Sequence, residues 1–302
     1  GASSAGSLDD AYRVLGISPD ASNDETMAMQ SMYEQIMDLV LFKGISREQV
    51  SELVEKNCVV FESFRAGESI VTFGQEQTRV LFIVSGNARM TTVSADRRIA
   101  ISQTISVGAV IGADALFGWE ITATATIDAL TDLSALVFDK EQYVRLLKSD
   151  DIYLLNYLNY LALNMHNARR SVRAFPADNV AGLLGRWLLT ATHQNGTNIM
   201  AHATIADLSE LTGIPEERVG KELKQLQADG LLLFNAEQGH IRITGRREFI
   251  EYLDPPLPDD AACQESPEDE ESDITQEEDD NTQEEGQSQS EAEETQTAEA
   301  AQ

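Results

Sequence analysis

The stretch TIADLSELTGIPEERVGKELKQL, at Thr204–Leu226, decides how the C-terminal part of this chain folds. Its apolar residues recur every three or four positions, as they do on the buried face of an α-helix. The spacing is interrupted at Gly213, where the backbone can bend. Thr204 can cap a first helix, and Pro215 suits the first position of a second helix, where a missing N–H is harmless. The stretch therefore predicts two short helices that share one buried seam.

A helix-turn-helix unit is the simplest interpretation of this pair, and the second helix of such a unit enters the major groove of DNA. Two further strands are expected around residues 236–239, in the position of a wing. The plain alternative is a pair of amphipathic helices whose charged residues face solvent. On the first interpretation, the DNA-binding residues are Thr204, Thr212, Glu216, Glu217, Arg218, Lys221, Lys224 and Gln225.

A long helix is predicted upstream, because apolar residues alternate spacings of four and three up to Phe175, before Pro176 ends the pattern. Such a seam predicts that two copies of the chain pack along it. The alternative is a helix packed on its own β domain, for which Leu155, Tyr157 and Tyr160 broaden the apolar face. The predicted homodimer contacts are Leu154, Leu158, Leu161, Met165, Ala168 and Val172.

Between Val60 and Phe138 apolar and polar residues alternate, and glycines recur between the alternating segments. This pattern predicts short antiparallel strands in a jelly roll or compact barrel, which holds a ligand cavity in some proteins and a packed core in others. The expected fold is α+β. Its parts are an N-terminal extension at 1–32, a double-stranded β-helix (jelly roll) at 33–148, a dimerisation helix at 149–176, a winged helix-turn-helix at 177–254 and a tail at 255–302.

The charge is strongly acidic, with a formal net charge of -29. Residues 255–302 hold 18 Asp or Glu and no Lys or Arg, so this tail is predicted to be disordered. The remaining 33 acidic and 22 basic residues still predict weak non-specific binding to DNA. We expect the tail either to compete with DNA for basic side chains or to act only as a solubilising segment.

Several classes of protein are disfavoured by the sequence. The absence of a long apolar run and of a leader at residues 1–10 predicts a cytoplasmic protein without a membrane segment. Cys58 and Cys263 are too few for a disulfide framework, a four-cysteine cluster or a closed zinc site. There is no nucleophile–base pair, P-loop or metal-ligand spacing, so neither an enzyme nor a cofactor is expected.

The order of these parts resembles the family of bacterial transcription regulators that contains the cyclic AMP receptor protein and Fnr. The resemblance runs from about Tyr33 to Leu253 and is carried by LFKGISREQV at 41–50, LFIVSGNARM at 81–90, VIGADALF at 110–117 and the helix pair at 208–232. It implies a homodimeric regulator that binds double-stranded DNA, with RNA polymerase and a small-molecule effector as further partners. The alternative is an adaptor that has lost DNA binding and acts through its β domain and acidic tail.

The effector pocket departs from the pattern of that family. In members that bind cyclic AMP, a Glu holds the ribose and an Arg holds the phosphate, whereas here Ala113 and Ala123 occupy those positions. Asp114 adds a negative charge where the phosphate would lie. The resemblance therefore implies an effector other than cyclic AMP, or none, and the missing N-terminal cysteines argue against an iron–sulfur cluster. The candidate pocket consists of Gly112, Ala113, Asp114, Ala123 and Thr124.

The resemblance also suggests roles on the second helix of the pair. Glu217 matches the glutamate that accepts hydrogen bonds from cytosine amino groups, and Lys221 matches a position that is usually basic. Glu216 stands where many members have an Arg, so Arg218 is the candidate for a guanine contact. Near the wing, the candidates for backbone contacts are Arg242, Arg246 and Arg247.

Overall fold

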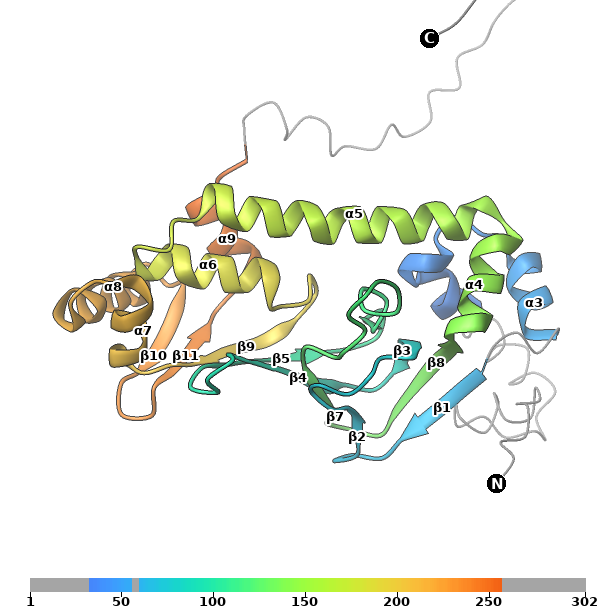
Figure 1. Cartoon of the computed structure of the whole chain (residues 1–302), viewed down its shortest axis with the longest axis horizontal. Helices are drawn as coiled ribbons and strands as arrows, with labels where there is room; N and C mark the ends of the chain where they lie inside the picture. The colour runs from blue at the N-terminus through green and yellow to red at the C-terminus, as the bar shows by residue number, and fades with distance from the viewer. Residues whose placement is uncertain (1–32, 56–59, 257–302) are drawn as a thin grey trace, which may run out of the picture. The chain divides into compact units, whose positions relative to one another are not determined.

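The computed structural model describes residues 33–55 and 60–256, which belong to one compact unit that ends at Pro256 (Figure 1). The expectations for the N-terminal extension, for both cysteines and for the acidic tail lie outside the described residues. Within the described part the fold is mixed α+β, with a β domain, a long helix and a C-terminal group of helices and strands.

The β domain (residues 60–139) consists of two antiparallel sheets that face each other across an apolar core. The strand order of the first sheet is β1-β8-β3-β6, and the second sheet contains the strands β5-β4-β7-β2 in that order. Leu81, Ile83, Ile105 and Ile127 lie in the core between them. The strands are β1 (Val60–Phe64), β2 (Ser69–Val71), β3 (Arg79–Ser85), β4 (Ala88–Val93), β5 (Ala100–Ile105), β6 (Val110–Ile111), β7 (Thr126–Ala129) and β8 (Leu133–Asp139).

Helices cover the outer face of the first sheet. They are η1 (Val40–Phe42), α3 (Arg47–Glu55), α4 (Lys140–Ser149) and the first half of α5 (Asp151–Ala174). Their apolar side chains form one cluster with the sheet, in which the ring of Phe42 meets Phe82 edge-on at 5.9 Å and Tyr153 at 5.7 Å. Because both faces of β8 are covered, six of its seven residues are buried and its sequence does not alternate.

Glycines lie at turns between strands of the β domain, as the sequence predicts. The φ angles of Gly67, Gly74, Gly86 and Gly108 are all positive. Gly86 has a further constraint, because a Cβ atom there would overlap the carbonyl oxygen of Asp132 and lie 2.8 Å from Leu133 Cα. A polar turn that includes Ala95 and Asp96 joins β4 to β5.

The long helix predicted upstream of Phe175 is confirmed, and it is α5. The carboxylate of Asp150 caps its N-terminus by accepting from the backbone N–H of Ile152, and the helix ends at Ala174. Tyr153 and Tyr157 are buried against the β domain. The seam is shorter than predicted, since Phe175 lies beyond the helix and is fully buried in the C-terminal core.

The C-terminal module (residues 180–254) contains the two predicted helices. Thr204 caps the first helix by a reciprocal pair of hydrogen bonds with Asp207, and Gly213 adopts the left-handed conformation between the helices. Pro215 is the N-cap of the second helix instead of its first residue, a shift of one position. The elements are α6 (Val180–Thr190), β9 (Thr197–His202), α7 (Ile205–Thr212), α8 (Glu216–Ala228), β10 (Leu232–Asn235), β11 (His240–Ile243) and α9 (Arg246–Leu253).

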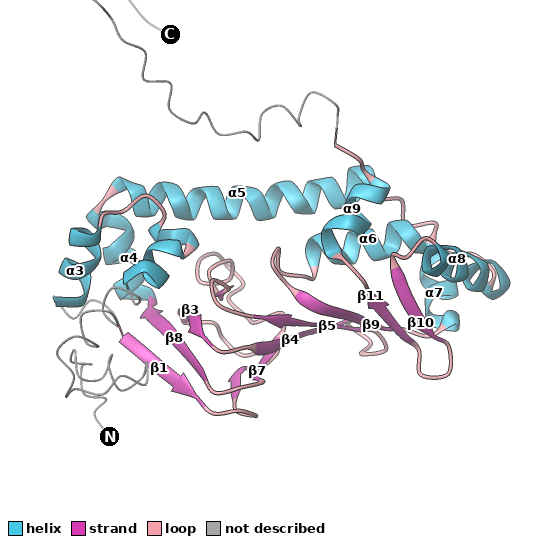
Figure 2. Cartoon of the chain, turned by 180° about the vertical axis from the view of Figure 1, so that it is seen from behind, coloured by secondary structure: helices cyan, strands magenta, loops and turns pink. Residues whose placement is uncertain are grey.

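The two regions share one sheet, which the sequence analysis did not foresee. Strand β9 pairs with β5 in antiparallel register, with Ile101 opposite Ala201, so that the second sheet runs β10-β11-β9-β5-β4-β7-β2 (Figure 2). Ile199 and Ala201 of β9 are buried in the core cluster that includes Ile99 and Ile101. The C-terminal module is thus docked on the β domain by strand addition.

Candidate functional site

Helix α8 presents an exposed, charged face. Val219, Leu223 and Leu226 are buried and fix the helix on the C-terminal module. The opposite side of the helix faces solvent. Its exposed side chains are those of Glu216, Glu217, Arg218, Lys221, Lys224 and Gln225.

Two of the three cations of this face, Arg218 and Lys221, are paired within the helix. Lys221 Nζ lies 2.8 Å from Glu217 Oε1, and Arg218 Nε donates to Glu222 Oε1 at 3.2 Å. Exposed pairs four residues apart on a helix are worth about 0.3–0.5 kcal/mol. Such weak pairs leave the cations free to turn toward an incoming anion.

The two predicted threonine contacts differ in accessibility. Thr204 is exposed, although its hydroxyl donates to Asp207 Oδ2 at 2.6 Å. Thr212 is only 9% exposed, and its hydroxyl donates to the carbonyl of Leu208 within α7. The side chain of Thr212 is therefore turned inward and unsuited to a phosphate contact.

Arg246 is not a surface residue of the wing, contrary to expectation. Its guanidinium is half-buried and donates to the carbonyl of Leu188 and to the hydroxyl of Thr192. Burial, followed by the nearby charge of Arg170, lowers its pKa. Arg246 thus ties α9 to the end of α6.

The predicted seam on α5 is an exposed apolar stripe within the described part of the chain. Leu154, Leu158, Met165 and Val172 are 40%, 49%, 53% and 68% exposed, and Ala168 is also exposed. Leu161 is half-buried against the N-terminal core cluster. Three residues were expected to pack if the helix lay on its own β domain. Of these, Tyr157 and Tyr160 pack on the β domain, whereas Leu155 is exposed.

An ion-pair cluster, here called the Arg98 latch, joins the β4–β5 turn to α7. The guanidinium of Arg98 donates to Asp207 Oδ1 through Nε and Nη2, at 3.0 and 2.7 Å, and to Glu210 Oε2 at 2.7 Å. Hydrogen bonds from Thr204, and then from Arg98, lower the pKa of Asp207 to about 2. Sequence reasoning missed this contact, whose partners are separated by 109 and 112 residues.

A buried amide makes a second connection between the β domain and the module. Gln103 of β5 is only 2% exposed; its Nε2 donates to the carbonyl of Ala191, and its Oε1 accepts from the backbone N–H of His193 at 2.8 Å. Because His193 Nδ1 accepts from the backbone N–H of Asn195, the ring proton is on Nε2. Burial lowers the pKa of His193, so its ring is neutral near pH 7.

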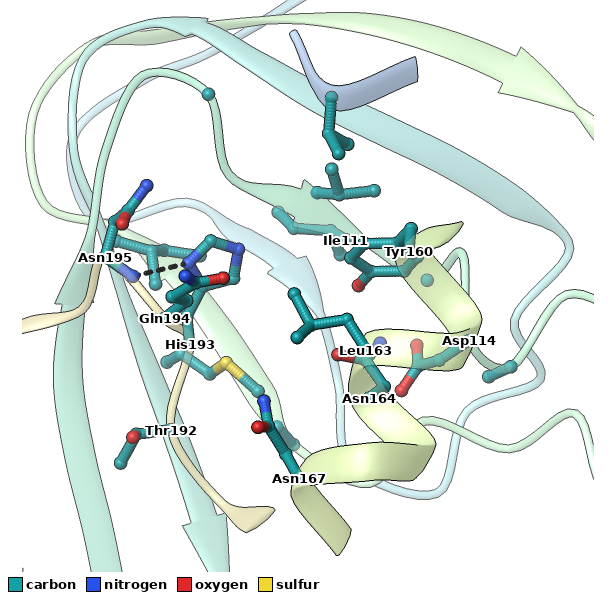
Figure 3. A pocket seen from close by; sticks show the side chains of 18 of the residues that line it. Ile111, Asp114, Tyr160, Leu163, Asn164, Asn167, Thr192, His193, Gln194 and Asn195 are labelled. Atoms are coloured by element: carbon teal, nitrogen blue, oxygen red, sulfur yellow. Dashed lines mark hydrogen bonds between the residues drawn. The ribbon is translucent and has the colours of Figure 1, made fainter. Parts of the chain in front are cut away.

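A cavity of about 940 Å³ lies between the β domain, α5 and the connection from α6 to β9 (Figure 3). Gly112, Asp114, Ala123 and Thr124 of the predicted pocket line it. Ala113 does not line it; this residue is buried, and its carbonyl accepts from the Tyr157 hydroxyl at 2.9 Å. The sequence analysis missed the lining residues from outside this segment, which include Asn164, Asn167, His193, Gln194 and Asn195.

Comparison with known proteins identifies the β domain. Residues 61–150 match the family model of the cyclic nucleotide-binding domain. The match covers the β domain and α4, so this part of the chain has that type of domain. No curated protein matched the chain significantly.

Solved structures also resemble the chain, at low identity. The catabolite activator protein of Thermus thermophilus is 18% identical with a TM-score of 0.42, and the match covers 71% of this chain and 98% of that protein. A transcriptional regulator of the CRP/FNR family, also from Thermus thermophilus, is 21% identical with a TM-score of 0.35, covering 64% and 100%. FixK2 from Bradyrhizobium japonicum is 18% identical with a TM-score of 0.32, covering 66% and 98%.

Residues 33–55 and 60–256 contain neither of two other features. No helix there is long and apolar enough to cross a membrane. In the same residues, no three His, Cys, Asp or Glu side chains are grouped so that they could hold a metal ion.

Proposed function

We propose that this protein is a sequence-specific DNA-binding transcription regulator of the Crp/Fnr type that acts as a homodimer. In this proposal the C-terminal module is a winged helix-turn-helix, with α8 as the recognition helix and the β10–β11 hairpin as the wing. The observation that carries the proposal is the position of α8, which is fixed by a buried seam and exposes a face of hydrogen-bonding and charged side chains.

The six side chains of the exposed face of α8 have the following roles in this proposal. Arg218 reads a guanine through its two-pronged donor set, and Glu217 accepts from a cytosine amino group. Lys221 and Gln225 reach neighbouring base edges, while Lys224 contacts phosphate. Glu216 limits the set of acceptable half-sites through its negative charge.

The exposed stripe on α5 supports the homodimer. An apolar strip of Leu, Met and Val side chains along an exposed helix is a surface that a second copy would cover. Two copies joined along this stripe would present two α8 helices to one duplex. In dimeric helix-turn-helix proteins, the half-sites lie about 34–36 Å apart, one helical turn of DNA.

The cavity supports an effector other than cyclic AMP. Ala123 offers no cation for a phosphate, and Asp114 places a carboxylate in the lining. Desolvating a phosphate beside a carboxylate is unfavourable, so the domain would serve a different ligand or none.

Charge reversal on α8 tests DNA binding. The Arg218→Glu/Lys221→Glu variant should lose specific duplex binding in a gel retardation assay, by about 1–3 kcal/mol for each lost base contact. Lys148→Glu, at an exposed position in the last turn of α4, is the matched control and should bind as the wild type does.

An adaptor without DNA binding is the second candidate, and the exposed carboxylate of Glu216, at a position where many members of the resembled family have an Arg, favours it. If wild type and the double variant are equally inert toward DNA selected from a random pool, the adaptor interpretation replaces the regulator.

A further inference from the structure

The cavity is lined by four parts of the chain, which are residues 35–43, the β domain, α5 and the connection from α6 to β9. The β domain contributes an apolar wall that includes Met90, Ile105 and Ile127. Helix α5 contributes Asn164 and Asn167, and the connection from α6 to β9 contributes residues 192–195. Figure 3 shows the α5 side chains on one side of the cavity and His193, Gln194 and Asn195 on the other.

The polar walls offer unused hydrogen-bonding groups. The side-chain amides of Asn167, Gln194 and Asn195 have no hydrogen-bond partner among the described residues. His193 adds an Nε2–H donor on a neutral ring. These groups both donate and accept, as hydroxyl groups of a ligand require.

The charged side chains in the lining balance, since Asp38 and Asp114 are matched by Lys43 and Arg246, so the lining has no net charge that favours an anion. Asp114 is a carboxylate, and Ala123 stands where the resemblance would place a phosphate-binding Arg. Arg246 also lines the cavity, but its Nε and Nη2 already donate to Leu188 and Thr192. A ligand with one apolar face and one hydroxyl-bearing face, and without charge, matches these walls best.

We propose that this cavity binds an uncharged nucleoside, with its base against the apolar wall of the β domain and its hydroxyls against the amides of α5 and of residues 193–195. The β domain matches the cyclic nucleotide-binding model, and the lining keeps room for base and ribose while lacking the phosphate contact. The ligand touches the C-terminal module directly, so its binding is coupled to the docking of β9 on β5. This proposal rests on the proposed function only where it treats the nucleoside as the effector of a DNA-binding regulator. The binding site itself does not depend on DNA binding.

Calorimetric titration of the full chain with ribonucleosides, in the absence of DNA, tests the site. At least one of adenosine, guanosine, cytidine and uridine should bind saturably. Where that nucleoside is a purine, it should bind at least about tenfold more tightly than its 3′,5′-cyclic monophosphate, because the phosphate would lie near Asp114 and Ala123 supplies no cation to offset that charge. No binding by any nucleoside, or equal or tighter binding of cyclic AMP or cyclic GMP, overturns the proposal.

Substitutions in the lining test whether the nucleoside binds in this cavity. Asn167→Leu and Gln194→Ala should each weaken nucleoside binding by about tenfold, as expected for a lost hydrogen bond. His166→Leu is the matched control, because this exposed neighbour on α5 is not part of the lining, and it should leave binding unchanged. Unaltered binding in both cavity variants would show that the nucleoside binds elsewhere and would contradict the proposal.

Two further readouts test charge and coupling. Ala123→Arg should narrow or reverse the preference against the cyclic monophosphate, whereas an unchanged preference would contradict the role of the missing cation. Bound nucleoside should slow amide hydrogen exchange across residues 192–202, and unchanged exchange there would exclude contact with the C-terminal module. Because none of these measurements involves DNA, a failure of DNA binding leaves them interpretable.

Discussion

At the scale of single residues, backbone geometry decides which glycines are essential. Gly86 and Gly67 have nearly the same φ, 84° and 85°, but only Gly86 has backbone atoms in the space of a Cβ. Gly67→Ala adds conformational strain alone, of about 1 kcal/mol. Gly86→Ala adds overlap with Asp132, so it should lower the free energy of unfolding by about 1–3 kcal/mol more. Urea unfolding of both variants measures the difference, and equal losses would contradict it.

The neutral His193 makes stability depend on pH. Its pKa in the folded state is depressed below 6.5 by burial, so the unfolded chain binds a proton at a higher pH than the folded chain does. The free energy of unfolding should therefore fall as the pH drops from 6.5 toward the folded-state pKa. Urea unfolding at pH 7.0 and 5.5 should show a smaller fall for His193→Gln than for wild type. An equal fall in both would assign the effect to other groups, such as His202, whose pKa is also lowered.

At the scale of elements, the Arg98 latch holds the C-terminal module against the β domain. Arg98→Glu would place a third carboxylate beside Asp207 and Glu210, so repulsion would replace the ion pairs and weaken the docking of the module. We expect faster amide exchange in β9, measured by mass spectrometry. Arg97→Glu is the control, because the Arg97 side chain has no ion-pair partner among the described residues. Equal exchange in the two variants would show that strand pairing alone holds the module.

Elements that depend on local periodicity could be predicted from the sequence. Helices α5, α7 and α8 follow from their spacing and caps, and the β domain follows from alternation and turn glycines. The pairing of β9 with β5 could not be predicted, because Thr197–His202 is short and its partner lies about a hundred residues away. For the same reason, the sequence alone indicated that Arg246 is a surface cation. Four of the five pocket residues line the cavity because they belong to one continuous segment around it.

At the scale of the whole molecule, the exposed stripe on α5 predicts self-association. Leu158→Glu/Met165→Glu would place charges in the proposed interface at positions that are half-exposed in a single chain, so folding should be little affected. Analytical ultracentrifugation at micromolar concentration should give a dimer for wild type and a monomer for the variant. Leu130→Glu, an exposed apolar position outside α5, should remain dimeric. A monomeric wild type would contradict the homodimer.

Selection of duplexes from a random pool by the wild-type protein tests the central claim most directly. If α8 reads the major groove in a two-fold dimer, the selected sequences should contain an inverted repeat whose half-sites are centred about 10–10.5 base pairs apart, or a multiple of this. The Arg218→Glu/Lys221→Glu variant should not enrich that repeat. A pool that stays random after selection with wild type, or a repeat enriched equally by the variant, would contradict the assignment of α8 as the DNA-reading helix.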